Sequence, residues 1–363
     1  MVQVAIVIPS LDPDKRLPRY CRDLRAITSA PILLVDDGSK PELRPIFDEC
    51  AAAGPDISFV RHGTNRGKGR ALKTAFAHLL ETRPDGIGCI TADSDGQHSP
   101  ADVARCLEHF QANPDALVLG VRDFSQSHVP LKSRFGNKGM LLFFRVATGR
   151  SFLDTQTGLR AIPAEMMRSL LSVPGERFEF ETRMLLALHD RPLLQIPIET
   201  IYEEGNKGTH FNPFSDSMKI CGILVKALAR RFGLFVLASA LSFVVDILLF
   251  RFLYYGVFDE EGRAHLFLSV VLARVVSGTF NYLVNRFLVF AESRKRHVFG
   301  HYSAHKYAVL ALAIVTASYL GTKILHAGFP GVSLTWIKAI VDLFLFLASF
   351  AIQRMVIFRH KAG

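Results

Sequence analysis

The chain has 363 residues, 49% of them hydrophobic and 10% aromatic, and its 43 Lys and Arg against 33 Asp and Glu leave a net charge of +10. This apolar and aromatic content excludes an intrinsically disordered chain. Five scattered cysteines form no Cys-x-x-Cys pair, which argues against a disulfide framework and a zinc site. Residues 2–8 are too short for the apolar core of a signal peptide, so we expect none there.

Up to about residue 225, short apolar runs alternate with longer segments of helical periodicity. The predicted strands are residues 2–8, 32–35, 57–60, 86–91 and 116–121, and the predicted helices are residues 17–27, 41–53, 67–81 and 100–111. Apolar strands separated by helices are typical of a mostly parallel α/β sheet covered on both faces. Ligands of such sheets bind at the carboxyl ends of the strands. Candidate functional residues are therefore sought at that edge.

Acidic or glycine-rich turns follow three of the predicted strands: Asp36-Asp37-Gly38-Ser39, Asn65-Arg66-Gly67-Lys68-Gly69 and Asp93-Ser94-Asp95-Gly96-Gln97-His98. One Asp-Gly pair is usually only a turn, but three such segments at one sheet edge favour a site. The second segment is not a P-loop, which needs four residues between its glycines and a Ser or Thr after the lysine. No Gly-x-Gly-x-x-Gly follows the first strand, which disfavours a dinucleotide-binding domain. Glycines, a lysine and a helix N-terminus still suit a diphosphate.

Asp93 and Asp95 lie two residues apart on an extended turn, so their carboxylates can converge on one cation, with the Gln97 oxygen nearby. Such an all-oxygen set suits Mg²⁺ or Mn²⁺ rather than zinc. A metal held by two carboxylates takes its remaining ligands from water and substrate phosphates. Because Asp-x-Asp also occurs in ordinary loops, the metal site is a hypothesis at this point.

In their order and spacing, these segments resemble the catalytic domains of glycosyltransferase family 2, which have the GT-A fold. The resemblance covers about residues 1–225 and is strongest to dolichol-phosphate mannose synthases and bactoprenol-phosphate sugar transferases. It includes Pro9, Asp154-Thr155-Gln156-Thr157-Gly158-Leu159-Arg160 and Phe178-Glu179-Phe180-Glu181. The last two segments look like the D-x-Q-[ST]-G-[FL]-R and F-E-x-E motifs of that branch.

The resemblance implies roles for individual residues. Asp36 and Asp37 would lie near the base and ribose, and Pro9, Lys68, Asp93 and Gln156 would also bind the donor. Asp93, Asp95 and Gln97 would hold a Mn²⁺ or Mg²⁺ that bridges the diphosphate. Arg122 and Arg134 match acceptor-phosphate arginines and, with Asp95, are the candidate catalytic residues. The chain lacks the late Arg and G-x-S-K segment of eukaryotic-like mannose synthases, so Lys207 and His210 are the candidates for that cationic contact.

Chemistry favours a phosphate acceptor independently of the resemblance. A sugar hydroxyl needs a general base to attack, whereas a lipid phosphate is already anionic near neutral pH and needs charge compensation and alignment. Arg122, Arg134 and Lys138 suit that need. A processive polysaccharide synthase would ordinarily have Gln-x-x-Arg-Trp after its core, but the single tryptophan, Trp336, lies in a predicted membrane span.

From Phe232 onward, four apolar segments have about the length that crosses a bilayer: residues 232–250, 266–290, 307–325 and 332–358. Buried core helices are the alternative. Basic residues precede the first segment, lie between the second and third, and follow the fourth, whereas the loop between the first two is acidic. The positive-inside rule then places both termini and the catalytic domain in the cytoplasm, with the spans in the plasma membrane.

Charged residues lie inside these spans, among them Asp246, Arg274, Lys338 and Asp342. Charges in a bilayer are costly unless they are paired or face water, and Lys338 and Asp342 are spaced to pair on one helix. Arg274 and Asn281-Tyr282-Leu283-Val284-Asn285-Arg286 match the R-x₆-N-[FY]-x₂-N-[KR] pattern of the GtrA-like four-helix family, which this half resembles. Residues 210–231 and 140–146 could lie at the bilayer surface or pack on the sheet.

We therefore expect a GT-A α/β catalytic domain with interfacial helices at residues 1–225 and a GtrA-like domain with four transmembrane helices at 226–363. The expected function is metal-dependent, inverting transfer of one sugar from GDP-mannose or a UDP-hexose to dolichyl or undecaprenyl phosphate at the cytoplasmic face. The expected partners are the donor, the lipid and the bilayer, without nucleic acid; a homo-oligomer is left open. The alternative is a flippase or transporter of lipid-linked sugar in which the soluble half supplies cargo.

Overall fold

The computed structural model describes residues 4–123, 131–199, 213–257, 263–290 and 302–358. Its contacts divide the chain into two compact units. The first, which we call the sheet unit, consists of Met1–Phe144 and Ser151–Ile223. The second, which we call the helical unit, consists of Arg145–Arg150 and Leu224–Lys361.

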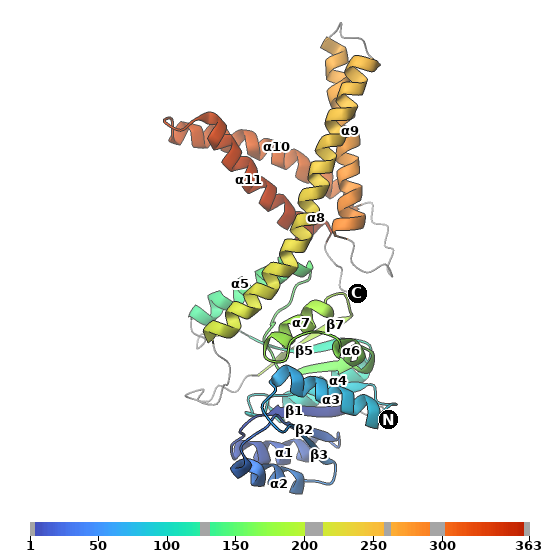
Figure 1. Cartoon of the computed structure of the whole chain (residues 1–363), viewed down its shortest axis with the longest axis vertical. Coiled ribbons are helices and arrows are strands. Elements are labelled where there is room, and N and C mark those ends of the chain that lie inside the picture. Colours follow the sequence, from blue (N-terminus) through green and yellow to red (C-terminus); the bar gives the residue numbers. More distant parts are fainter. Residues whose placement is uncertain (1–3, 124–130, 200–212, 258–262, 291–301, 359–363) are drawn as a thin grey trace. The chain divides into compact units, whose positions relative to one another are not determined.

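The sheet unit is built on a seven-stranded sheet in the order β3-β2-β1-β4-β6-β5-β7 (Figure 1). Its strands are β1 (Val4–Ser10), β2 (Ile32–Asp36), β3 (Ile57–Arg61), β4 (Gly88–Thr91), β5 (Leu117–Arg122), β6 (Arg160–Pro163) and β7 (Leu193–Ile198). Only β6 runs antiparallel to its neighbours, β4 and β5. The predicted mostly parallel α/β sheet is therefore confirmed, and it has the mixed form of a GT-A domain.

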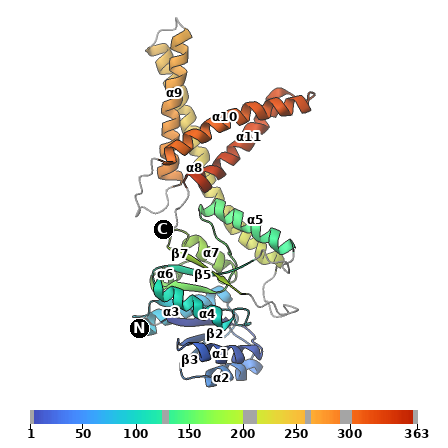
Figure 2. The same cartoon turned by 180° about the vertical axis from the view of Figure 1, so that it is seen from behind.

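Helices cover both faces of the sheet. They are α1 (Arg16–Ile27), η1 (Pro41–Leu43), α2 (Arg44–Ala52), α3 (Lys68–Thr82), α4 (Pro100–Ala112), α6 (Ala164–Leu170) and α7 (Glu179–Ala187). A further helix, α5 (Leu131–Thr148), belongs to this unit up to Phe144 and to the helical unit from Arg145. One buried apolar cluster joins α1, α2 and α4 to the strands, while α3 packs with α6 and α7 over the other face (Figure 2). All β1 and β2 residues are buried, which explains their continuous apolar runs.

Local sequence signals set the start of α4, the helix that follows the Asp93–His98 turn. Ser99 is its N-cap, and the Ser99 Oγ accepts a hydrogen bond from the backbone N–H of Asp102 at 3.1 Å. Pro100 occupies the first helical position, where its missing N–H costs nothing. These two residues end the turn and fix where the helix begins.

The helical unit contains four long helices: α8 (Pro213–Gly256), α9 (Arg263–Val284), α10 (Tyr302–Gly328) and α11 (Leu334–Ile352). Short π-helical turns follow two of them, η2 (Asn285–Val289) after α9 and η3 (Gln353–Ile357) after α11. Within the described residues, three stretches are long and apolar enough to cross a membrane, Met218–Gly256, Ser303–Gly328 and Ile340–Ile357. A span at α9, the second of the four expected, stays a prediction.

The first expected span and the amphipathic segment before it form one helix. α8 continues without a break from Pro213 to Gly256, so the expected boundary at residue 225 falls inside a helix rather than in a linker. The apolar segment at 140–146 likewise lies within α5. Both segments are therefore parts of longer helices.

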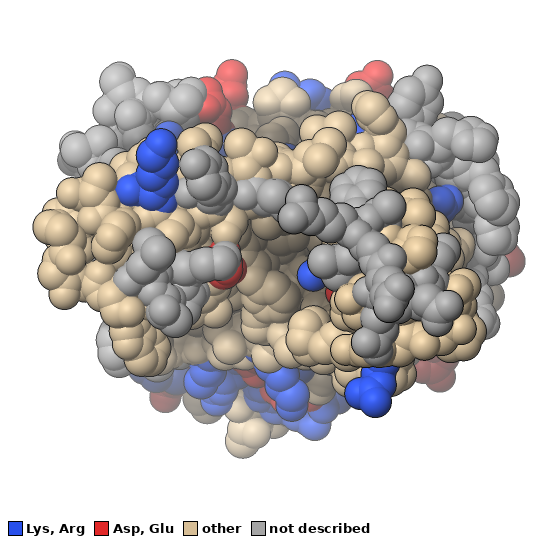
Figure 3. Space-filling view, turned by 90° about the horizontal axis from the view of Figure 1, so that it is seen from above, with Lys and Arg blue, Asp and Glu red and all other residues tan. Residues whose placement is uncertain are grey.

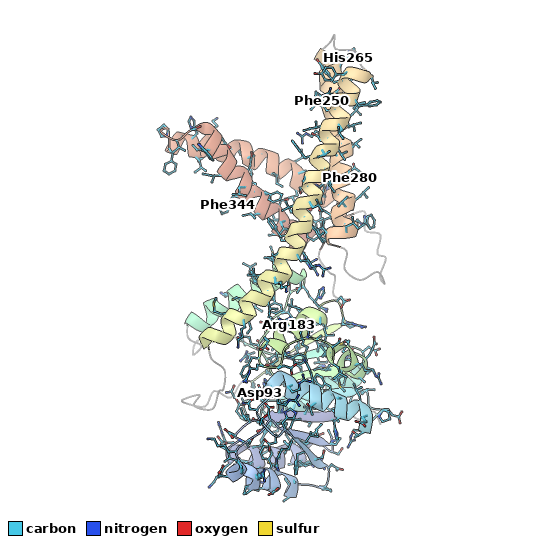
Figure 4. The ribbon with its side chains drawn as sticks, in the orientation of Figure 1. Asp93, Arg183, Phe250, His265, Phe280 and Phe344 are labelled. Atoms are coloured by element: carbon cyan, nitrogen blue, oxygen red, sulfur yellow. The ribbon has the colours of Figure 1, made fainter. Side chains whose placement is uncertain are left out.

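The exposed surface of the helical unit is largely apolar. Seen from above, its described atoms belong mostly to residues other than Lys, Arg, Asp and Glu (Figure 3). Phe344 of α11, marked in Figure 4, is 74% exposed, and Leu312 of α10 is 71% exposed. Apolar side chains of this size, exposed along helices of membrane-spanning length, suit contact with lipid.

Two of the charged residues inside the helices have polar partners on the neighbouring helix. Asp246 of α8 accepts a hydrogen bond from the Ser277 hydroxyl at 2.9 Å and lies 3.5 Å from the Arg274 guanidinium, both on α9. Asp342 of α11 accepts a hydrogen bond from the Ser318 hydroxyl of α10 at 2.5 Å. The Lys338 side chain lies outside the described residues, so its predicted pairing with Asp342 is untested.

Candidate active site

A pocket of about 520 Å³ lies at the carboxyl ends of β1, β2, β4 and β5. It is lined by eight of the residues predicted from the sequence: Pro9, Asp37, Lys68, Asp93, Asp95, Gln97, Arg122 and Gln156. A second pocket, of about 500 Å³, lies near the opposite edge beside Ala5 and Ile32 and contains none of these residues. The predicted side chains therefore gather in one place, where a doubly covered sheet is expected to bind its ligand.

The two aspartates after β2 have different surroundings. Asp37 lines the pocket, is buried, and accepts hydrogen bonds from the backbone N–H groups of Arg66 and Gly67 at 3.0 and 2.7 Å. It also contacts His62 Nδ1 at 2.7 Å. Asp37 thus holds the loop that opens α3 in place.

Asp36 does not line the pocket in the described part of the chain. Its carboxylate accepts a hydrogen bond from the Ser39 backbone N–H at 2.8 Å and another from Arg61 Nε at 2.6 Å. Asp36 is almost completely buried at the end of β2. Its observed contacts stabilise the turn, and they do not test the predicted proximity to the base and ribose.

Lys68, the first residue of α3, reaches across the pocket to two acids. Its Nζ lies 2.7 Å from Asp93 Oδ1 and 3.2 Å from Glu181 Oε2. Burial alone would lower the pKa of Lys68, but these two carboxylates raise it above its ordinary value. Lys68 is therefore a fixed positive charge at a helix N-terminus, an arrangement that attracts phosphate.

Asp93, marked in Figure 4, packs against the glycine of the Asp-x-Gln-Thr-Gly motif. A Cβ on Gly158 would overlap the Asp93 carboxylate, so this position has room only for glycine. Burial would raise the pKa of Asp93, yet Lys68 and His98 hold it well below the usual range. Asp93 is thus ionised and held in a tightly defined position.

Asp95 is the second carboxylate of the turn, and its Oδ1 accepts a hydrogen bond from the Gln97 backbone N–H at 3.1 Å. Burial and the nearby negative charge of Asp93 raise the pKa of Asp95. Two carboxylates close enough to perturb each other favour a bound cation, because a cation relieves their repulsion.

The donor set of the pocket fits a hard divalent cation that shares its coordination with the substrate. Among the described residues, no three His, Cys, Asp or Glu side chains cluster to hold a metal. Two carboxylates and an amide oxygen are nevertheless the usual protein share for Mg²⁺ or Mn²⁺ bound together with phosphates. Six carboxylates and four cations line the pocket, so an incoming diphosphate would need added positive charge.

Arg122 ends β5 and is oriented by Asp154, the first residue of the Asp-x-Gln-Thr-Gly motif. Its Nε and Nη2 donate to the two carboxylate oxygens of Asp154 at 2.7 and 3.1 Å. Asp154 is fully buried, whereas the Arg122 side chain remains 21% exposed and lines the pocket. This bidentate pair fixes the guanidinium at the pocket wall.

The other predicted acceptor cations are not described by the structure. Arg134 belongs to α5, but its side chain lies outside the described residues, and so do Lys207 and His210. Lys138, four residues beyond Arg134 on α5, is exposed. The predicted acceptor site is therefore visible only at Arg122.

Three functional candidates received no individual role from sequence reasoning. Glu181 joins Lys68 to Arg160, whose Nη2 lies 3.6 Å from Glu181 Oε1. The available signal was the pair of segments to which they belong, Phe-Glu-x-Glu and Asp-x-Gln-Thr-Gly-Leu-Arg. Each segment resembles a family motif. Neither motif indicates that Glu181 contacts both Lys68 and Arg160.

Arg177 is the third candidate. It lines the pocket, and a Cβ on Gly67 would lie 2.6 Å from Arg177 Cγ, so its side chain passes over the start of α3. The other pocket cations are paired: Arg16 with Asp14, Lys68 with Asp93, and Arg122 with Asp154. Arg177 has no acidic partner within the part of the chain described, which makes it a candidate for binding a phosphate.

Two family descriptions match the chain, and they fall on different parts of it. Residues 5–167 match "Glycosyl transferase family 2", and residues 234–358 match "GtrA/DPMS, transmembrane domain". The first match includes the pocket residues from Pro9 to Gln156. The second includes most of the helical unit.

Named relatives are similar to about half of the chain. One is the UDP-N-acetylglucosamine–dolichyl-phosphate N-acetylglucosaminyltransferase of Methanococcus voltae, 26% identical over 55% of this chain and 86% of the relative. Another is the polyprenol monophosphomannose synthase of Mycolicibacterium smegmatis, 29% identical over 46% of this chain and 63% of the relative. A glucosyl-3-phosphoglycerate synthase structure from Mycobacterium tuberculosis, with Mn²⁺ and UDP, superposes with a TM-score of 0.46 and 16% identity over 64% of this chain and 80% of that one. Residues 5–167 therefore form a glycosyltransferase family 2 domain, and residues 234–358 form a GtrA/DPMS transmembrane domain.

Proposed function

We propose that this glycosyltransferase transfers one sugar from a nucleotide-sugar to a polyprenyl phosphate. The observation that carries the proposal is the pocket in which Asp93, Asp95 and Gln97 lie with Lys68 and Arg122. Two carboxylates beside fixed cations suit a diphosphate donor with a divalent cation and a second, anionic substrate. One named relative is a dolichyl-phosphate N-acetylglucosaminyltransferase and another is a polyprenol monophosphomannose synthase, which supports a lipid acceptor here as well.

On the donor side, we assign the diphosphate to the start of α3. Lys68 and Arg177 supply positive charge there, and Asp37 holds the loop so that its glycines allow close approach. Asp93, Asp95 and Gln97 would hold Mn²⁺ or Mg²⁺, which neutralises charge on the departing diphosphate when it is bound. Pro9, Asp36, Asp37 and Gln156 complete the proposed donor site, with GDP-mannose and UDP-hexoses as the candidate donors.

On the acceptor side, we assign the lipid phosphate to Arg122 and Arg134, with Lys207 and His210 as further cations. One oxygen of the lipid phosphate attacks the anomeric carbon of the sugar, and the bond to the nucleoside diphosphate breaks with its electron pair leaving on the diphosphate. Direct in-line attack inverts the anomeric configuration. The phosphate oxygen carries no proton to remove, so no general base is needed. Alignment of the two substrates and compensation of their charge then lower the barrier to transfer.

We further propose that residues 1–225 form the catalytic domain on the cytoplasmic face of the plasma membrane and residues 226–363 the membrane domain. Lys226, Arg230 and Arg231 precede the first span as expected from the sequence, residues 232–250, and the segment between α8 and α9 contains Asp259, Glu260 and Glu261. This bias favours a cytoplasmic location for the sheet unit, where nucleotide-sugars are available.

The test is transfer by the purified full chain. Radiolabelled GDP-mannose, UDP-glucose and UDP-N-acetylglucosamine are each incubated with the protein, undecaprenyl phosphate and Mn²⁺. We expect one donor to give an organic-soluble labelled lipid, and excess chelator to abolish the signal. Absence of labelled lipid with every donor and with both dolichyl and undecaprenyl phosphate would refute the proposal.

A further inference from the structure

The helical unit contains a repeated sequence that ends two of its helices. Residues 285–290 read Asn-Arg-Phe-Leu-Val-Phe after α9, and residues 353–358 read Gln-Arg-Met-Val-Ile-Phe after α11. Both begin with a side-chain amide and an arginine and end with phenylalanine. Both adopt a π-helical turn, which is rare in proteins and frequent at functional sites.

The two turns pack against each other through equivalent residues. Asn285 Nδ2 donates to Gln353 Oε1 at 3.1 Å, and both amides are buried. The rings that end the two turns, Phe290 and Phe358, stack with their centroids 5.2 Å apart and their planes at 20°. The helical unit is thus organised as two related helix pairs, α8–α9 and α10–α11, joined at their π turns.

The arginines of the two repeats have different partners. Arg286 donates from Nη1 to the Tyr282 hydroxyl at 2.7 Å and lies over the Tyr282 and Phe287 rings. Arg354 is completely buried, and its Nη2 donates to the backbone carbonyl of Ala147 at 3.2 Å. Ala147 belongs to α5 and, by its contacts, to the helical unit.

The Arg354 guanidinium lies at the carboxyl end of α5. That helix ends at Thr148, and the next residue, Gly149, has a left-handed φ of +73° and donates its N–H to the Arg145 carbonyl at 2.8 Å. A Cβ on Gly149 would lie 3.3 Å from Arg354 Cζ, so the two are in close contact. The last carbonyls of a helix have no hydrogen-bond donor within the helix, and they carry partial negative charge. A buried cation can donate to these carbonyls and balance that charge.

We propose that Arg354 is a positioning residue for the acceptor. It holds the end of α5, the helix that also contains Arg134 and Lys138, two cations that suit an acceptor phosphate. A fully buried arginine in a membrane unit is expensive. The equivalent Arg286 donates to the Tyr282 hydroxyl, one turn before it, and not to the end of α5 in the contacts described above. The hydrogen bond from Arg354 to the Ala147 carbonyl at the end of α5 offsets part of this desolvation cost. This inference rests on the proposed function.

The test compares steady-state transfer by Arg354→Met and Arg286→Met in the full chain, with undecaprenyl phosphate as the acceptor. We expect Arg354→Met to raise the acceptor KM roughly tenfold, because a charge-assisted hydrogen bond at the helix end is lost. The donor KM should stay at its wild-type value. Arg286→Met, the matched control with the same sequence context, should leave both constants unchanged.

Two further variants separate positioning from folding. Arg354→Lys keeps a cation at the helix end and should restore most of the acceptor affinity. Gly149→Ala leaves Arg354 in place but disturbs the same contact, and it should raise the acceptor KM in the same direction. If Arg354→Met does not yield folded protein, these two variants decide.

The proposal is overturned if the acceptor KM of Arg354→Met matches that of Arg286→Met, or if donor and acceptor KM rise together. It is equally overturned if Arg354→Lys is as impaired as Arg354→Met, or if Gly149→Ala keeps the wild-type acceptor KM. These outcomes all require an active wild-type protein. A wild type that transfers no sugar to any polyprenyl phosphate refutes the proposed function instead, so the two failures are distinguishable.

Discussion

The two units of this chain bury polar groups in contrasting ways. Around the pocket of the sheet unit, charged side chains from distant segments meet in pairs, such as Lys68 with Asp93 and Arg122 with Asp154. In the helical unit, many buried contacts join neutral groups, such as the amides of Asn285 and Gln353. Full charges can be held and used at a sheet edge that opens to water, whereas neutral hydrogen bonds stabilise helices at lower desolvation cost. We therefore expect substitutions at the sheet edge to affect chemistry most.

The largest effect is expected from Asp95→Ala. Removing this carboxylate deprives the departing diphosphate of the charge neutralisation that a bound cation supplies, and transfer should fall roughly a thousandfold. Circular dichroism should show an intact fold. Asp85→Ala, an exposed aspartate outside the pocket, is the control and should keep wild-type kcat/KM. Turnover within tenfold of wild type, or turnover insensitive to chelator, would contradict the metal assignment.

A smaller loss, on the order of a hundredfold in kcat/KM, is expected from Gly158→Ala. The new methyl group would occupy the space of the Asp93 carboxylate, so the acid must move away from its position beside Lys68. Gly63→Ala is the matched control, because no atom lies within 4 Å of a Cβ built there. Equal activity of the two alanine variants would show that the exact position of Asp93 has no role in transfer.

Arg177→Gln removes a charge that has no acidic partner among the described residues, while keeping a polar side chain. We expect the donor KM to rise about tenfold, because one charge-assisted contact to phosphate is lost. The acceptor KM should stay constant. Arg168→Gln, another exposed arginine of the same unit, should change neither constant. A rise in the acceptor KM alone would contradict this assignment and would indicate that Arg177 binds the acceptor.

Asp95→Asn replaces a charged group with a neutral amide, like the amides buried in the helical unit. The change in Tm that we expect from it is the smallest of the predicted effects. Burial and Asp93 raise the pKa of Asp95, so ionised Asp95 destabilises the metal-free fold near neutral pH. The variant should therefore have a higher Tm there, by less than the ~2–4 °C that 1 kcal/mol produces in a domain of this size. The gain should disappear as the pH falls through the raised pKa, where the wild-type carboxyl becomes neutral. A lower Tm for the variant at neutral pH would be evidence against this account.

Much of the sheet unit could be predicted because its strands are continuous apolar runs and its motif residues follow them directly. β6 and β7 were not predicted. β6 has only four residues, ends in Pro163 and runs antiparallel, while β7 contains Pro197 and is only partly buried. Neither has the long Val- and Ile-rich run that identified β1 and β2.

The candidate site was predictable as a set of residues but not as a set of contacts. The spacing of Asp93 and Asp95 indicated a shared ligand, whereas the pairing of Lys68 with Glu181 joins residues more than a hundred positions apart. Nothing local in the sequence shows that Asp36 turns toward Arg61 or that Gly158 makes room for Asp93. Such pairings depend on the topology that brings the segments together.

The most direct test of the central claim compares two acceptors that differ only in the phosphate. The purified full chain is incubated with its preferred labelled nucleotide-sugar and Mn²⁺, and with either undecaprenyl phosphate or undecaprenol dispersed in the same detergent. The account predicts labelled lipid from the phosphate alone, because the attacking group must be anionic and must bind the cations of the pocket. Equal transfer to the free alcohol would contradict it, since a hydroxyl acceptor requires a general base, a role that the account assigns to no residue of the pocket.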